Sequence, residues 1–106
     1  MNNEEPIVGG LYTSRGEDGL LHLLKVLVAD AHAVHVRFYA ERFSELPPGL
    51  TSEQLSLGSL GSPGGFGIGH APMSREGFLR EQREFVARET VSDSELEGYR
   101  IWAGEE

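Results

Sequence analysis

The stretch "LLHLLKVLVADAHAVHVRFYAERF", residues 20–43, constrains the fold more than any other part of the chain. In its second half apolar and polar side chains alternate, which is the period of two expected of a β-strand with one buried face. The buried face of this strand would consist of Val34, Val36 and Phe38. The opposite face would present His35, Arg37 and Tyr39. The segment "DAHA", residues 30–33, would be the hairpin turn that joins this strand to the one before it.

A helix is the alternative for the same stretch, because apolar side chains also recur at intervals of three and four residues between Leu20 and Phe38. Four valines favour strands, since β-branched side chains lose rotamer freedom in a helix and pack well on a sheet. We therefore expect strands across residues 7–43.

Residues 44–73 are rich in glycine and proline, which predicts a long loop region. Within it, "LTSEQLSLG" could form a short edge strand or a single helical turn. A loop of this length is either an excursion over the surface or a functional flap.

Residues 74–104 predict two short helices. Ser74 is the expected N-cap of the first, which would continue through Phe85 and Val86. Ser92 and Glu95 form the capping-box pattern of the second, and Gly104 would end it.

Together these segments predict a single α+β domain covering residues 1–106, in which residues 1–9 are mobile. The architecture would be a small antiparallel β-sheet or an SH3-like, partly open barrel, with two short C-terminal helices packed against it. The aliphatic residues of the two central strands would form the core with aromatic side chains, namely Phe38, Phe78, Phe85, Tyr99 and Trp102.

The composition is that of an ordinary soluble globular protein, with 39% hydrophobic and 25% charged residues. The longest apolar run, from Leu23 to Ala29, is interrupted by Lys25 and is too short to cross a membrane. The first ten residues contain two acids and no base, unlike a secretory signal peptide, and the chain has no cysteine. We therefore expect a cytoplasmic protein that does not bind membranes.

The formal net charge is −8, and acidic residues occur throughout the chain. An acidic surface repels phosphate backbones, so nucleic acid is not an expected partner. A basic protein fits this charge better. The alternative is that the acidity merely keeps the protein in solution.

Four segments of the chain, "KVLVADAHAVHVRFYAERF", "LSLGS", "GFGIGHAPMS" and "ELEGYRIW", together resemble a group of small uncharacterised bacterial proteins. That group shares a Lys-Val-Leu strand, a Val-His-Val-Arg-x-Tyr strand, a Gly-Ile-Gly-His-x-Pro turn and a final Glu-Leu-x-Gly-Tyr-x-x-Trp. The likeness spans about residues 10–102 and implies a common fold without implying an activity. It also implies that the recurrent polar positions are Lys25, Asp30, His35, Arg37, Tyr39, Arg42, His70, Glu95 and Tyr99.

Four histidines, His22, His32, His35 and His70, would be enough in number to bind zinc. However, His32 and His35 fall on opposite faces of a regular strand, because their spacing is odd. None of the four shows the tight spacing typical of zinc sites. The sequence therefore predicts no metal and no cofactor.

An enzymatic function would use His35 and His70 as the catalytic pair of a hydrolase, with Arg37 and Tyr39 beside them. No nucleophile elbow, His-Glu-x-x-His motif or paired-carboxylate spacing accompanies them. His70 could instead hydrogen-bond the backbone of its glycine-rich turn. The sequence thus favours a non-enzymatic function.

Binding of another protein is the function that the sequence favours. His35, Arg37, Tyr39 and Arg42 would form the binding face, because arginine and tyrosine are enriched at interface hot spots. The alternative is an ordinary exposed or helix-covered sheet face, in which Arg37 pairs with Glu41 or Glu95. We therefore predict a small acidic binding module, to which an immunity-like or inhibitor role is assigned by analogy alone.

Overall fold

The computed structural model of the chain describes residues 6–57, 67–81 and 83–104. Its elements, in chain order, are β1 (Gly10–Arg15), β2 (Leu21–Ala29), β3 (Ala33–Phe43), the 3₁₀ turn η1 (Ser52–Gln54), β4 (Ile68–Ser74), α1 (Arg75–Arg80), β5 (Glu84–Arg88) and α2 (Glu97–Trp102). The five strands form one antiparallel sheet in the order β4-β3-β2-β1-β5. This confirms an α+β fold built on a small antiparallel sheet. The strands described do not join β4 to β5, so the sheet is not closed into a barrel.

Strands β1, β2 and β3 form a meander, which confirms the expected strands and excludes the helical alternative for residues 20–43. The turn between β2 and β3 is held by Asp30, whose carboxylate accepts hydrogen bonds from the backbone N–H groups of His32 and Ala33, both at 2.8 Å. An Asx turn of this kind fixes the hairpin register. His32 is therefore exposed at a hairpin tip.

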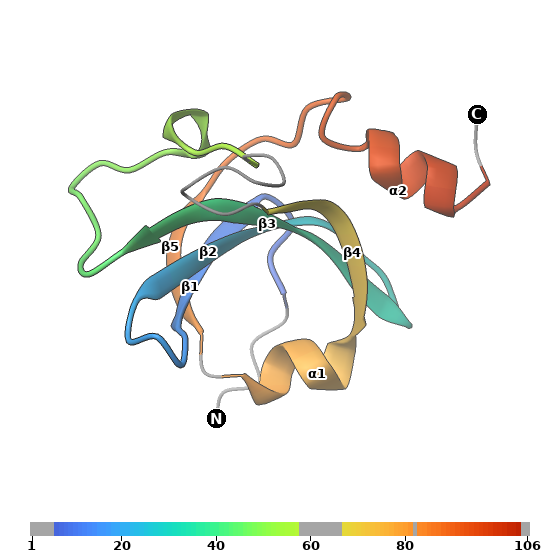
Figure 1. Cartoon of the computed structure of the whole chain (residues 1–106). Coiled ribbons are helices and arrows are strands. Elements are labelled where there is room, and N and C mark those ends of the chain that lie inside the picture. The colour runs from blue at the N-terminus through green and yellow to red at the C-terminus, as the bar shows by residue number, and fades with distance from the viewer. Residues whose placement is uncertain (1–5, 58–66, 82, 105–106) are drawn as a thin grey trace.

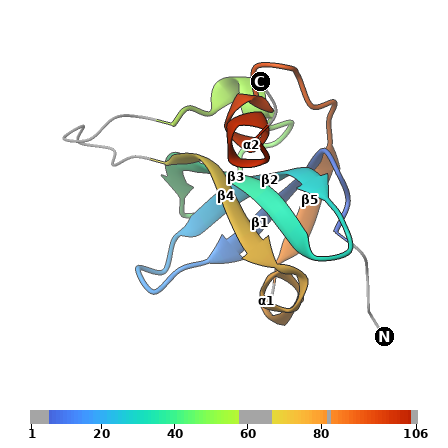
Figure 2. The ribbon, with the colours of Figure 1, turned by 90° about the vertical axis from the view of Figure 1, so that its right-hand side faces the viewer.

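The curved sheet is covered on both faces (Figures 1 and 2). Helix α1 lies against one face, which we call the α1 face, and α2 lies over the other, the α2 face, together with the segment around η1. The α1 face carries one hydrophobic cluster of buried residues, consisting of Tyr12, Leu24, Val26, Val34, Val36 and Phe78. A second cluster lies on the α2 face and consists of Leu11, Leu23, Tyr39 and Leu50. The alternation in β3 thus divides its side chains between the faces as the sequence predicts.

The first C-terminal helix is shorter than expected. Ser74 caps it as predicted, because its hydroxyl accepts a hydrogen bond from the backbone N–H of Gly77 at 2.8 Å, but α1 ends at Arg80. Residues 84–88, expected to be helical, form β5 and pair with β1. Pairing with the free edge of β1 gives every second backbone group a partner, and this tertiary gain overrides the helical pattern.

The loop expected across residues 44–73 also needs correction, because β4 begins at Ile68 and pairs with β3. β4 is an edge strand, and an edge strand tolerates Pro72 because one row of its N–H groups needs no partner. Gly67 precedes it at a point where a side chain could not fit, since an added Cβ would lie 2.1 Å from the carbonyl oxygen of Phe38. The glycine that predicts a loop thus allows close packing between strands.

The segment expected to form either a short edge strand or a single helical turn forms the helical turn, η1.

The expected aromatic core is confirmed for Phe78, which is 5% exposed, and is wrong for two other residues. Phe85 is 49% exposed because it lies on the edge strand β5, and Trp102 is 56% exposed because it ends α2.

Residues 1–5 of the expected mobile segment lie outside the described residues. Gly9 is held between two strands, donating to Val26 O and accepting from Glu89 N, both at 2.8 Å. None of the helices described is long and apolar enough to span a membrane.

Phe78 fixes α1 to the sheet through an edge-to-face contact with Tyr12, at 5.3 Å between ring centroids. We expect Phe78→Ala to lower the free energy of unfolding by about 3–5 kcal/mol, because it empties a packed site. The matched control is Leu79→Ala, since Leu79 is the next residue and is 48% exposed. It should cost less than about 1 kcal/mol. Urea denaturation measures both, and equal losses would contradict this packing.

Candidate functional site

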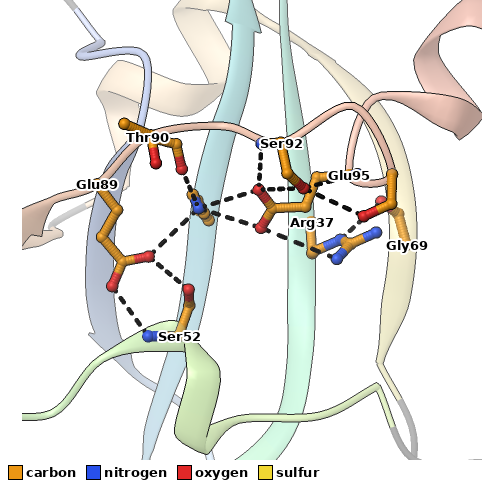
Figure 3. A network of polar contacts seen from close by, with 9 residues as sticks. Arg37, Ser52, Gly69, Glu89, Thr90, Ser92 and Glu95 are labelled. Atoms are coloured by element: carbon orange, nitrogen blue, oxygen red, sulfur yellow. Dashed lines mark hydrogen bonds and ion pairs between the residues drawn. The ribbon is translucent and has the colours of Figure 1, made fainter.

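The polar residues predicted on one face of β3 do share the α2 face, but they are not open to solvent. Lys25 on β2 lies opposite Arg37 on β3 and belongs to the same polar stripe. The C-terminal segment, residues 89–103, covers this stripe, as Figures 1 and 3 show. His35 is fully buried and Tyr39 is 8% exposed. The face that the sequence offers for binding is therefore mostly an internal contact surface.

Lys25 is the only lysine of the chain and is 2% exposed. Its ammonium group donates to the carbonyl oxygen of Thr90 at 2.8 Å and to both carboxylate oxygens of Glu95, at 3.0 and 3.2 Å. It also forms an ion pair with Glu89 Oε1 at 3.2 Å. An ammonium group has three N–H donors, so all three are occupied. Lys25 thereby fastens the start of the C-terminal segment to the centre of the sheet.

The two carboxylates that pair with Lys25 are held from outside as well (Figure 3). Glu89 accepts hydrogen bonds from the backbone N–H of Ser52, at 2.9 Å, and from the Ser52 hydroxyl. Glu95 accepts from the backbone N–H of Ser92 at 2.8 Å. Burial alone would raise the pKa of both carboxyl groups, but these hydrogen bonds and Lys25 hold both pKa values below the usual range. Both groups are therefore ionised at neutral pH.

The contacts of the predicted capping box are present, since the Ser92 hydroxyl accepts from the backbone N–H of Glu95 at 3.2 Å. The box stabilises the turns at residues 93–96, and α2 itself begins at Glu97. Gly104 ends the helix with a positive φ of 81°, as the sequence predicts.

Arg37 makes internal contacts rather than facing a partner. Its Nε donates to the carbonyl oxygen of Gly69 at 3.3 Å, and its Nη1 lies 4.0 Å from Glu95 Oε2. Figure 3 shows the guanidinium group between β4 and the C-terminal segment. Of the two pairings considered for Arg37, the one with Glu95 is therefore present.

Tyr39 lies on the same face and carries an unusual hydroxyl. Among the residues described, this buried oxygen has no hydrogen-bond partner. Burial, and next the nearby Glu95 carboxylate, raise the pKa of Tyr39 to about 12. The Ser52 side chain is close enough to oppose this shift, but its own proton is donated to Glu89. Tyr39 thus remains a neutral phenol at neutral pH.

His35 and His70 come together, as the enzymatic hypothesis requires. His35 Nδ1 and His70 Nε2 share a hydrogen bond of 3.0 Å, and the two rings are stacked with an angle of 10° between their planes. His70 was expected in a glycine-rich turn, but it lies in β4. The Tyr99 and Trp102 rings of α2 close over this pair, at 4.7 and 4.6 Å from the His35 ring.

The close approach of α2 depends on Gly98, because an added Cβ would lie 2.7 Å from the Cβ of His70. A bare backbone at this position lets the helix settle on the imidazole. His35 Nε2 has no partner under this cover among the described residues. His35 is therefore enclosed and presents no free nitrogen to a substrate, whereas His70 stays partly exposed.

Burial lowers the pKa of both imidazoles, since a charged ring is poorly solvated there. Asp30 partly opposes this shift at His35, while the proximity of His35 lowers the pKa of His70 further. Both rings are therefore neutral at pH 7, and one donates to the other.

The remaining predicted site residue, Arg42, is exposed near the end of β3, across from His22 on β2. It is not part of the cluster around Lys25 and His35. Within the described ranges, no three histidine, aspartate or glutamate side chains are placed to hold a metal ion.

A cavity of about 520 Å³ lies on the α2 face between η1 and the C-terminal segment. It is lined by Lys25, Thr51, Ser52, Glu53, Glu89, Thr90, Ser92, Ser94 and Glu95. The sequence analysis missed this cavity and the roles of Ser52 and Glu89. One available signal was a lone lysine inside an apolar run, because a buried ammonium requires carboxylate partners elsewhere in the chain.

Comparison with known proteins finds no match to a family model, to a curated protein or to a solved structure. The resemblance to the group of bacterial proteins therefore stays a prediction. The chemistry of the site is accordingly argued from the residues of this chain.

Replacing Lys25 by methionine should lower the free energy of unfolding by about 3 kcal/mol, because it leaves two partly buried carboxylates without their shared cation. Arg100→Met is the matched control, since the ion pair between Arg100 and Asp93 is exposed and should contribute less than about 1 kcal/mol. Urea denaturation at neutral pH measures both variants. A Lys25→Met protein as stable as the wild type would show that the buried network is not needed.

Acidification should destabilise the protein through the histidine pair. The folded pKa values lie below 6.5, so the unfolded chain binds more protons as the pH falls below that value. The free energy of unfolding should therefore be constant above about pH 6.5 and fall below it, before Glu89 and Glu95 begin to titrate. Urea denaturation between about pH 8 and about pH 5 measures this slope.

Two histidine variants test the source of that slope. His70→Asn should flatten it, because it removes one of the two imidazoles whose pKa is lowered. His32→Gln should retain it, because His32 is exposed at the hairpin tip. An unchanged slope in His70→Asn would contradict the assignment to the pair.

Proposed function

We propose that this chain is a small acidic binding module whose partner is another protein with a basic surface. The observation that carries the proposal is how folding distributes the charges. Among the described residues, ten carboxylate side chains are exposed against five arginine side chains. The only lysine is buried, and Arg37 is turned toward Glu95. The exposed side chains of the described residues thus hold twice as many carboxylates as cations, which leaves the surface acidic.

Such a surface attracts cationic partners and speeds their association, whereas it repels nucleic acid and anionic membranes. An immunity-like or inhibitor role, in which an acidic protein blocks a basic one, is the class of role that matches this charge. The absence of cysteine supports a cytoplasmic location. The strand order, with α1 between the two edge strands, supports kinship with SH3-like, partly open barrels as a finer description of the fold.

The hydrolase alternative has less support. It draws on the 3.0 Å contact between His35 and His70, but a general base must reach its substrate. Tyr99 and Trp102 cover the pair, and the described cavity at Lys25 is not lined by either histidine. Binding through the acidic surface requires no such opening.

Affinity capture from the native host, followed by mass spectrometry, tests this proposal. The bait is the full chain, and the control bait carries Glu17→Gln, Glu53→Gln and Glu84→Gln, which neutralise exposed carboxylates outside the buried network. We expect a basic protein to be retained by the wild type, released by salt and depleted on the control bait. A partner that is acidic, or one that is retained equally by both baits at high salt, would overturn the proposal.

A further inference from the structure

Helix α2 rests on the sheet through the two imidazoles. The rings of Tyr99 and Trp102 contact the His35 ring, at 4.7 and 4.6 Å between centroids. The backbone of Gly98 lies against His70. None of the described residues of α2 is itself fully buried, and Trp102 is 56% exposed. A helix of six residues with so little buried surface detaches at low cost, so its position depends on these contacts.

The contact beneath α2 has room for a single proton. His35 Nδ1 and His70 Nε2 are 3.0 Å apart, so one nitrogen donates a hydrogen bond and the other accepts it. Two protonated rings cannot make this contact, because both facing nitrogens then carry a hydrogen and neither accepts. The two positive charges would also repel each other at this short distance.

A positive charge on His35 is poorly solvated while α2 is in place. His35 is fully buried, and among the described residues its Nε2 has no hydrogen-bond partner. Protonation puts an N–H at this nitrogen beneath the rings of Tyr99 and Trp102. Release of α2 would open the ring to water, which solvates the charge. The protonated pair therefore favours the released helix.

The charged and titratable groups that face the pair do not cancel this preference. In the turn between β2 and β3, the Asp30 carboxylate favours a proton on His35, but burial opposes that proton more strongly and lowers the pKa. On β3, Arg37 adds a positive charge to the same face. Helix α2 faces the pair with the phenol of Tyr99. The charged residues of α2 are exposed, namely Glu97 and Arg100.

The segment that leads into α2 stays fastened in the pH range where histidines titrate. Glu95 is paired with Lys25 at 3.0 Å and accepts from the backbone N–H of Ser92 at 2.8 Å. Although burial opposes them, these contacts hold the pKa of Glu95 below its usual range, so its carboxylate keeps its charge there. Helix α2 begins two residues later, at Glu97, and is free to move while Glu95 stays bound.

We propose that His35 and His70 form a pH-sensitive latch, which releases α2 from the sheet when both imidazoles are protonated while the strands stay folded. Release uncovers the His35 side of β3 and frees the rings of Tyr99 and Trp102. The inference is independent of the proposed function, because the latch requires no partner.

The test is NMR spectroscopy of the full chain between about pH 7.5 and about pH 5. The readout is the set of NOE cross-peaks between the rings of α2 and the side chains of β3 and β4. Cross-peaks between Val26 and Val36, which are paired across β2 and β3, are the reference for the sheet. We expect the α2 cross-peaks to disappear reversibly on acidification while the reference cross-peaks remain. The ratio of released to docked helix should rise by between about tenfold and about a hundredfold per pH unit, since release takes up as many as two protons.

Three variants locate the latch. His35→Leu should keep α2 docked at about pH 5, because an apolar side chain supports the rings and takes up no proton. His70→Asn should reduce the dependence to at most about tenfold per pH unit, because one proton is left, and it is the second variant in case His35→Leu does not fold. His32→Gln should release α2 as the wild type does, because His32 is exposed at the hairpin tip.

Gly98→Ala tests the released helix without acid. An added Cβ would lie 2.7 Å from the Cβ of His70, which is too close for the helix to stay docked. This variant should therefore lack the α2 cross-peaks at about pH 7.5 and keep those of the sheet.

Cross-peaks of α2 that persist in the wild type at about pH 5, or that disappear together with those of the sheet, would overturn the inference. Release of α2 in His35→Leu or in His70→Asn with the pH dependence of the wild type would overturn it as well, because the protons would then act elsewhere.

Discussion

The ammonium group of Lys25 is the interaction on which the α2 face depends. It is buried at the centre of the sheet, and the segment that follows β5 supplies all of its acceptors, Thr90 O and the carboxylates of Glu89 and Glu95. An unpaired cation there would cost several kcal/mol, so the segment must lie where it does. In this place the C-terminal segment forms one wall of the acidic cavity, and it carries α2 over β3 and β4.

Helix α2 has six residues and would not persist alone, because helices of that length do not offset the cost of nucleation. Its position follows from contacts at both ends. The Ser92 and Glu95 contacts anchor the turn before it, and the rings of Tyr99 and Trp102 close on His35. His35 is therefore a buried packing residue, and protonation of its ring would oppose that packing.

Prediction from sequence succeeded where local pattern and tertiary demand agree. Alternation in β3 assigned Val34 and Val36 to one face and His35 to the other, and Asp30 supplied the turn. It failed at residues 84–88, where an apolar pattern compatible with a helix became an edge strand. Glycine content likewise predicted a loop where β4 lies. That prediction failed because a strand that packs closely against its neighbour also needs glycine. The site showed the same division: the polar stripe was found, but a binding face was favoured over the covered face that the structure has.

The sequence by itself determined the β-meander, the alternation that separates core from polar face, the caps at Ser74 and Gly104, and the acidic charge, because these depend on residues near one another in the chain or on composition alone. Only the tertiary structure decided that Lys25 meets Glu95, 70 positions away, and that His35 meets His70. Such contacts depend on which strands pair and which segment crosses which face, and no local periodicity records that choice. The acidic cavity, with Glu53 at its rim, arises from the same choice, since its walls come from segments that only folding brings together.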